Sequence, residues 1–201
     1  MFTGTYISSH PRTDSPGVHN PDEAGGNVGS KATLGLLAGF ERGFVGTASA
    51  MVDGEAYDGD KAYKDSKLCN VMTSLELAKR LKARRSRVTS NVMNPGLIPT
   101  TGLFRAFSPL FVIPFTFLTR TVFKVAATEE EGGSRLCELI QGPSLDGVSG
   151  QYLSTARAGL GLSDFMPIAP SIEARDEDKT RRLWILTEQL IKKKNPKFKA
   201  V

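Results

Sequence analysis

A tyrosine and a lysine four residues apart, Tyr63 and Lys67, lie in the stretch KAYKDSKLCN at positions 61–70. On a helix this spacing places the phenol and the ammonium one above the other on the same face. A cation beside a phenol stabilises the phenolate and lowers the phenol pKa from its ordinary value of about 10. The pair is therefore typical of a proton-transfer device. The spacing alone also fits a half-buried tyrosine beside a solvated lysine.

A second group of candidate residues follows the helix. Residues 87–93, RVTSNVM, predict a strand, and the turn Asn94-Pro95-Gly96 comes directly after it, with Thr100 close behind. A loop at the carboxyl end of a strand lies where α/β proteins bind ligands. We expect Thr5 to end the first strand at the same edge and to bring a hydroxyl to the site.

Helical and strand patterns alternate along the chain and must position these residues. Helices are predicted at 61–84, from the capping box at 128–131 to about 140, and at 176–193. Strands are predicted at 1–8, 87–93 and 148–154. This alternation predicts an α/β fold with a parallel sheet. With so few strands, the chain is expected to be the carboxyl-terminal half of a doubly wound, Rossmann-like domain whose first, nucleotide-binding half is missing.

Three segments between and after these elements have distinct compositions. Residues 9–59 are rich in Gly, Pro, Asp and Ser and predict a long irregular loop of the kind that usually has a function. Residues 97–127 include the apolar run FSPLFVIPFTFL, which is shorter than the roughly 20 residues of a membrane-spanning helix and is expected to form a lid beside the substrate. Residues 192–201 form a basic tail, expected to be solvated.

Composition narrows the function classes further. The chain has 201 residues, of which 40% are hydrophobic, and a net charge of +5 that comes largely from the tail. This is ordinary globular composition and gives no reason to expect nucleic acid as a partner. The start of the chain has no secretory signal pattern. Cys69 and Cys137 match neither a disulfide framework nor a metal spacing, and both are expected to be buried thiols in a reducing compartment.

Several other groups look functional at first sight and are expected to be structural. The stretch GGNVGSK at 25–31 does not have the spacing of a phosphate-binding loop. His10 and His19 are expected to be solvated. Asp53 and Asp58 are expected to serve turns rather than to act as general bases.

Taken in order, the hydroxyl, phenol, ammonium and Pro-Gly loop with its threonine resemble the short-chain dehydrogenase/reductase superfamily. The blocks KAYKDSKLCN and TTGLFR, at 61–70 and 100–105, resemble more narrowly the light-dependent NADPH:protochlorophyllide oxidoreductases. The likeness is carried further by three lesser blocks: MVDG at 51–54, Gly25-Gly26 and EEEGG at 129–133. It runs in order along essentially the whole chain.

The resemblance implies a chemistry and a set of roles. NADPH would deliver hydride to one carbon of the ring D double bond of protochlorophyllide, a proton would reach the neighbouring carbon, and light absorbed by the pigment would start the reaction. Tyr63 would donate or organise the proton, and Lys67 would lower its pKa and hold the nicotinamide ribose. Thr5 would supply the catalytic hydroxyl, while Thr100 and the backbone of Pro95 and Gly96 would hold the nicotinamide amide.

The resemblance also implies a plastid location, and it is compatible with a homo-oligomer and with peripheral membrane contact. No metal is expected. Because a glycine-rich phosphate turn is not found among the 201 residues, we expect the isolated chain neither to bind NADPH tightly nor to turn over.

The sequence departs from the family at the Pro-Gly loop. The family usually has Tyr-Pro-Gly-Cys where this chain has Asn94-Pro95-Gly96-Leu97, and Leu97 has no proton to give. The aromatic run expected after Val148 is reduced to Tyr152. These changes leave two alternatives open: a general NADP(H)-dependent alcohol or ketone reductase, and a non-catalytic fragment that acts as an interaction module.

Overall fold

The computed structural model describes residues 5–6, 18–22, 26–44, 50–99, 108–122, 126–154 and 165–198. The helices are α1 (Ala38–Arg42), α2 (Gly59–Ala83), α3 (Pro109–Phe117), α4 (Glu129–Gln141) and α5 (Glu177–Lys194). The strands are β1 (Thr5–Tyr6), β2 (Ser90–Asn94), β3 (Tyr152–Ser154) and β4 (Met166–Pro167). A π-helical turn, Leu118–Val122, continues α3. The predicted helices at 61–84, 128–140 and 176–193 are confirmed to within two residues at each end.

The strands form one sheet in the order β1-β2-β3-β4. β1 and β2 are parallel, as are β2 and β3, whereas β4 runs antiparallel to β3. The predicted α/β class is confirmed, and the predicted parallel pairing holds for β1, β2 and β3 but not for β4. The sequence did not predict β4, because its two residues, Met166 and Pro167, are exposed and show no strand periodicity.

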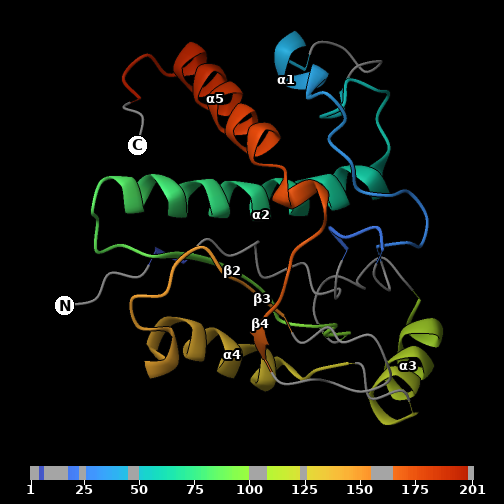
Figure 1. Ribbon diagram of the computed structural model, residues 1–201. Coiled ribbons are helices and arrows are strands. Elements are labelled where there is room, and N and C mark those ends of the chain that lie inside the picture. Colours follow the sequence, from blue (N-terminus) through green and yellow to red (C-terminus); the bar gives the residue numbers. More distant parts are fainter. Residues whose placement is uncertain are drawn as a thin grey trace.

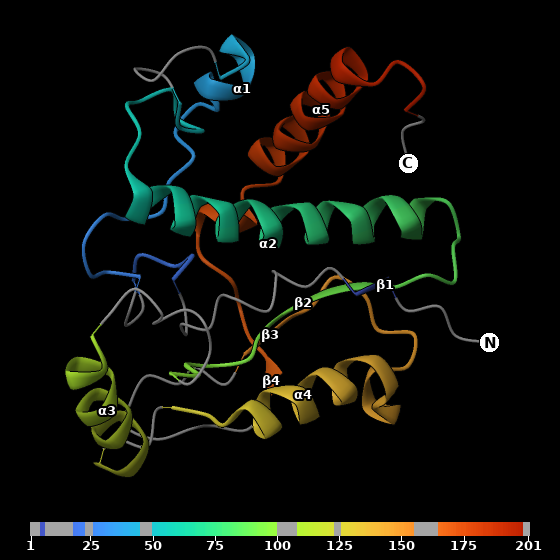
Figure 2. The same cartoon turned by 180° about the vertical axis from the view of Figure 1, so that it is seen from behind.

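Helices cover both faces of this sheet, with α2 on one side and α4 on the other (Figures 1 and 2). The alternation of side chains along β2 explains the two layers. Val92 lies in the hydrophobic cluster with Leu68 and Met72 of α2, while Met93 lies in a second cluster with Leu139 of α4. α5 packs on the outer side of α2 and contributes Leu183 to the first cluster.

The two parallel connections of the sheet have opposite hands. β1, β2 and β3 follow one another in space, yet the helix between the first two lies on one face and the helix between the next two on the other. One of the crossovers is therefore left-handed, although about 98% of such connections are right-handed. This uncommon connection lets two helices cover both faces of the parallel strands.

α2 begins and packs for reasons visible in its sequence. The carboxylate of Asp58 caps the helix by accepting the backbone N–H of Lys61 at 2.9 Å. Near the other end of the helix, the Ser74 hydroxyl lies 3.0 Å from that of Ser90, the first residue of β2. α2 therefore runs antiparallel to β2, and its first turns lie toward the carboxyl end of that strand.

The long segment before α2 has little regular structure but a substantial core. Within the described residues of 9–59, α1 is the single helix and there is no strand. Leu34, Leu37 and Ala32 are buried and join the cluster that contains Leu68 of α2. The prediction of a long irregular segment is confirmed for these residues, and its apolar side chains anchor it on the helix.

α3 is apolar and largely exposed. Ser108 caps it, Pro109 occupies its first turn, and Pro114 lies within it. Leu110, Ile113 and Phe117 all face outward. Among the described residues, no helix has both the length and the apolar composition needed to cross a membrane. Part of the segment at 97–127 is thus helical, and its use as a lid stays a prediction.

The two cysteines differ from each other. Burial raises the pKa of the Cys69 thiol to about 12. Cys137 lies on an exposed side of α4, so the expectation that both thiols are buried is wrong. The reason is that α4 faces the sheet with Leu139 and leaves the side that carries Cys137 in solvent.

Candidate functional site

Tyr63 and Lys67 lie on the first two turns of α2, one turn apart. The ammonium of Lys67 sits over the Tyr63 ring, 5.4 Å from its centroid, and both side chains are half-buried. The cation thus contacts the face of the aromatic ring, a favourable cation–π arrangement. The structure brings together the phenol and the ammonium that the sequence spacing predicts.

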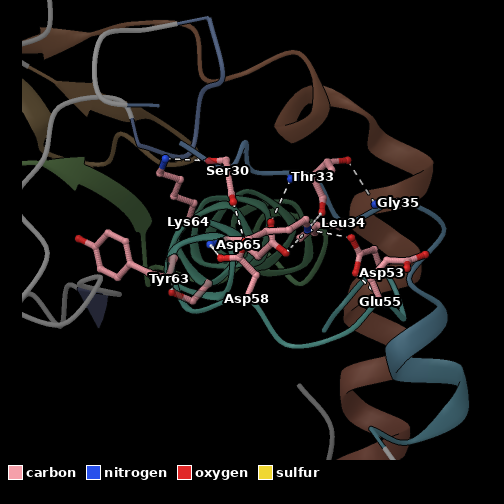
Figure 3. A network of polar contacts seen from close by, with 12 residues as sticks. Ser30, Thr33, Leu34, Gly35, Asp53, Glu55, Asp58, Tyr63, Lys64 and Asp65 are labelled. Atoms are coloured by element: carbon pink, nitrogen blue, oxygen red, sulfur yellow. Dashed lines mark hydrogen bonds and ion pairs between the residues drawn. The ribbon is translucent and has the colours of Figure 1, made fainter. Parts of the chain in front are cut away.

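A network of charged groups occupies another side of the same turns (Figure 3). The ammonium of Lys61 is 2.5 Å from Asp65 and 2.9 Å from Asp53, and it also donates to the carbonyl of Thr33 at 2.7 Å. Asp65 is 1% exposed and accepts the backbone N–H of Thr33 at 3.0 Å. Burial alone would lower the pKa of Lys61, but the hydrogen bonds to Asp65 and Asp53 outweigh it and raise that pKa above its usual value.

Lys64 extends this network to the segment GGNVGSK. Its buried ammonium donates to the carbonyls of Val28 and Ser30, the latter at 2.7 Å, and pairs with Asp60 at 3.1 Å. A phosphate-binding loop would instead turn backbone N–H groups toward its ligand. Two of the carbonyls face a lysine here, and the N–H of Ser30 donates to Asp60, so the expectation that this segment is not a phosphate loop is supported.

The aspartates expected to be turn residues have structural roles. Asp58 caps α2 and accepts the Ser30 hydroxyl at 2.8 Å. Asp53 accepts the backbone N–H of Glu55 at 3.1 Å and pairs with Lys61. Burial alone would raise the pKa of Asp53, but its hydrogen bond with Lys61 lowers it below the usual range.

The Pro-Gly loop is held in a defined shape where β2 ends. The side-chain oxygen of Asn94 accepts the backbone N–H of Gly96 at 3.1 Å. Gly96 has φ +98°, a conformation that favours glycine. Arg135 on α4 donates to the carbonyl of Pro95 at 2.5 Å. The loop is thus held both by the last residue of β2 and by α4.

Asn94 is buried, with 8% of its surface exposed. Its side-chain nitrogen makes no hydrogen bond within the part of the chain that the structure describes. Thr180 on α5 shares this property, but it lies in the wide groove at the opposite end of β2. No sequence pattern indicates this unused donor at Asn94, since asparagine before Pro-Gly fits an ordinary turn.

Thr5 does not lie where the sequence predicts. It pairs with Ser90, the first residue of β2, whereas Asn94 is the last. Thr5 is therefore at the amino end of β2 and not at the edge that carries the Pro-Gly loop. The error arises because a short apolar stretch shows that a strand exists but does not show its register. Thr100 lies outside the described residues.

His19 corrects another expectation. It is 3% exposed, and its ring packs edge-on against Tyr152 with a centroid distance of 4.8 Å. Its Nε2 accepts the backbone N–H of Ser171 at 3.4 Å. Burial lowers its pKa from 6.5 to about 4, so this histidine is neutral and structural rather than solvated. A lone histidine in a polar segment carries no signal of such packing; His10 lies outside the described residues.

Neither a metal-binding cluster within the described parts of the chain nor a family match was found. Among the described residues, no group of three or more His, Cys, Asp or Glu side chains could hold a metal ion. No family model matches the chain.

The sequence of this chain is similar to several known proteins. The chloroplastic protochlorophyllide reductase of Cucumis sativus is 40% identical over 172 residues, covering 86% of this chain and 42% of that protein. Protochlorophyllide reductase A of Oryza sativa subsp. japonica is 41% identical over 174 residues, covering 86% of this chain and 43% of that protein. This chain is similar to the protochlorophyllide reductases. The resemblance inferred from the KAYKDSKLCN and TTGLFR blocks is thereby confirmed.

The similarity has a defined extent. This chain spans less than half the length of both these reductases, and 54% of the protochlorophyllide reductase of Avena sativa, which is 40% identical over 174 residues. A crystal structure of an uncharacterized protein from Mycobacterium paratuberculosis aligns with 90% of this chain and 49% of its own, with a TM-score of 0.47 and 21% identity.

Proposed function

We propose that this chain takes part in the light-dependent reduction of protochlorophyllide to chlorophyllide with NADPH, a step of chlorophyll biosynthesis. The observation that carries the proposal is the 40% identity to protochlorophyllide reductases over 86% of the chain. The cation-on-ring pair of Tyr63 and Lys67 supports it. Because these relatives are named chloroplastic, a plastid location belongs to the same proposal.

The fold supports a role as the carboxyl-terminal half of a doubly wound domain. β1, β2 and β3 are parallel, and α2 and α4 cover the two faces of the sheet. Within that frame, residues 61–84 would carry the catalytic pair and residues 97–127 would cover the pigment. Residues 9–59 would support the start of α2, and the tail at 192–201 would stay in solvent.

NADPH would supply the hydride when bound. The site fits such a ligand because the carboxyl end of β2 carries a tight turn at Gly96 and the unused amide donor of Asn94. Pro95, Gly96 and Thr100 would hold the nicotinamide amide. Lys67 would bind the nicotinamide ribose and favour the phenolate form of Tyr63.

Tyr63 would supply or organise the proton for the ring carbon next to the one that receives hydride. A phenol is a suitable general acid when a nearby cation stabilises the anion left behind. The half-buried position of Tyr63 allows contact with a ligand while limiting access of water. Thr5 was expected to add a hydroxyl, but its pairing with Ser90 argues against that role.

The proposal is tested by titrating the chain with protochlorophyllide in the dark and then illuminating with NADPH. We expect the pigment to bind and its absorption to stay unchanged on illumination of the chain alone. Adding the amino-terminal portion of the Avena sativa reductase, outside the matched region, should restore a light-dependent shift to chlorophyllide. Absence of both pigment binding and complementation would refute the proposal. Robust reduction by the chain alone would show that it needs no second portion.

A general NADP(H)-dependent reductase is the second candidate. Asn94 and Leu97 support it, because this loop has the form of an ordinary dehydrogenase rather than the Tyr-Pro-Gly-Cys of the pigment reductases. The same complemented protein would then reduce a carbonyl substrate in the dark and leave protochlorophyllide unchanged under light.

A further inference from the structure

Among the residues that the structure describes, the side-chain amide of Asn94 uses its oxygen in a hydrogen bond but not its nitrogen. Its oxygen accepts the N–H of Gly96, while its nitrogen is buried and has no acceptor within the described part of the chain. Exchanging the two atoms would not help, since an NH₂ group would then face the N–H of Gly96. A buried donor without an acceptor is costly, so a hydrogen-bond acceptor on a bound ligand would stabilise this site.

The position of Asn94 relates this donor to the Tyr63–Lys67 pair. Ser90, Val92 and Asn94 alternate onto the same face of β2, and Val92 packs against α2. From the contact between Ser74 and Ser90, β2 advances about 13 Å to Asn94 at its usual rise per residue.

α2 covers a similar distance in the same direction. From Ser74 back to Lys67 is about 10 Å, and from Ser74 back to Tyr63 is about 16 Å, at the usual helical rise. Asn94 is therefore level with the Tyr63–Lys67 pair, on the face of the sheet that α2 covers. The open donor and the proton-transfer pair belong to one site.

Asn91 provides the contrast within the same strand. It is about as buried as Asn94, but its nitrogen donates to the carbonyl of Val148 at 2.9 Å and its oxygen accepts the N–H of Gln151 at 3.0 Å. Both ends of the Asn91 amide thus join β2 to the segment that precedes β3. In Asn94, the side-chain oxygen accepts one hydrogen bond and the side-chain NH₂ group is unused within the described residues.

We propose that the side-chain nitrogen of Asn94 donates a hydrogen bond to a carbonyl-type oxygen of the ligand bound at this edge, and so helps to determine ligand specificity. This inference rests on the proposed function. Both ligands of that reaction carry such an oxygen: NADPH in its nicotinamide carboxamide, and protochlorophyllide in its ring ketone and carboxylate groups. A ligand that presents a donor at this position would be rejected, because two donors would then face each other.

The test uses Asn94→Asp in the whole chain, complemented with the amino-terminal portion of the Avena sativa reductase, and Asn91→Asp is the matched control. Asn94→Asp keeps the acceptor for Gly96 and removes the donor, whereas Asn91→Asp removes a donor that Val148 uses. NADPH binding is followed by nucleotide fluorescence, and protochlorophyllide binding by absorbance in the dark. We expect Asn94→Asp to weaken at least one ligand tenfold or more, and Asn91→Asp to lower stability while changing affinity less.

A pH titration separates donation from packing. A protonated aspartic acid regains one O–H donor, so binding by Asn94→Asp should recover as the pH is lowered, while the wild type shows no such recovery. Weakening of NADPH alone identifies the carboxamide as the acceptor, and weakening of protochlorophyllide alone identifies the pigment. Equal affinity of Asn94→Asp and the wild type for both ligands would overturn this inference and leave the proposed function intact. If the complemented wild-type protein bound neither ligand, both the inference and the proposed function would be overturned.

Discussion

Two sides of the first turns of α2 have opposite characters. One side carries Lys61, Lys64 and Asp65, whose charged groups are engaged by Asp53 and by backbone groups of residues 28–33. The other side carries Tyr63 and Lys67, which contact each other through a ring face. In Figure 3 the Tyr63 side chain points away from the network around Asp53 and Asp65. One stretch of ten residues thus combines an anchoring side with a side suited to chemistry.

This difference explains why the full sequence KAYKDSKLCN is more specific for one family than the Tyr-Lys spacing alone. A proton-transfer pair needs only Tyr63 and Lys67. The anchoring side needs particular charges, because Lys64 and Asp65 hold the preceding segment against the helix. The block that carries the resemblance therefore includes residues, such as Lys64 and Asp65, that hold the surroundings of the site in place. The predictions below separate the two sides, ordered by their expected effect on stability.

Lys61→Met should be the most destabilising change. It leaves Asp65, which is 1% exposed, without its cation and removes the partner of Asp53. Loss of one member of a buried ion pair costs about 3–5 kcal/mol. Urea denaturation followed by circular dichroism measures the change. Lys67→Met, which removes a cation from the other side, should cost no more than about 1 kcal/mol. Equal losses in the two variants would contradict the division into two sides.

His19 should make stability depend on pH. Its pKa is lowered from 6.5 to about 4 by burial, so the unfolded chain binds a proton more readily than the folded one. Its contribution to stability is complete above pH 6.5 and is lost as the pH falls toward 4. The loss over this window amounts to about 3 kcal/mol.

Thermal melting between neutral and acidic pH measures this effect, and His19→Gln is the control. The glutamine can still accept the N–H of Ser171 but does not titrate. Its stability should fall much less over the same window. A variant with the same pH dependence as the wild type would show that other groups are responsible.

Gly96→Ala should cost about 1–3 kcal/mol, because a side chain at φ +98° is strained. The change lies on the ligand side, so ligand affinity should fall along with stability. Gly133→Ala is the matched control: a methyl group there meets no atom within 4 Å, and alanine favours the helix. If Gly96→Ala were as stable as the control, the loop could relax to a conformation that other residues adopt.

Some features of the structure can be predicted from the sequence alone. Helix α4 is one, because Thr128 and Glu131 form a local capping box, and the structure contains both of its hydrogen bonds. The stacking of Lys67 over Tyr63 followed from helical spacing alone. Both features depend on residues close together in the chain.

The features missed depend on distant residues. The burial of His19 requires Tyr152 and Ser171, more than 130 residues away in the sequence. The position of Thr5 along the sheet is set by its pairing with Ser90. The hydrogen bonds of the Lys64 ammonium are made to carbonyls of a segment that shows no periodicity in its sequence. Local patterns give elements and spacing, whereas register and burial are set by long-range packing.

Tyr63→Phe should change stability least and chemistry most. The ring remains under the Lys67 ammonium, and loss of a hydroxyl typically costs about 1 kcal/mol or less. Removal of a general acid typically lowers the rate about 100-fold or more. The light-driven shift of protochlorophyllide in the complemented protein measures the rate, and Tyr57→Phe, at an exposed position, is the control. An active Tyr63→Phe variant would mean that the proton comes from another group, and that the side of α2 with Tyr63 and Lys67 serves binding rather than proton transfer. A variant that is both inactive and strongly destabilised would instead assign Tyr63 to the anchoring side, because only that side is expected to lose stability when a single polar group is removed.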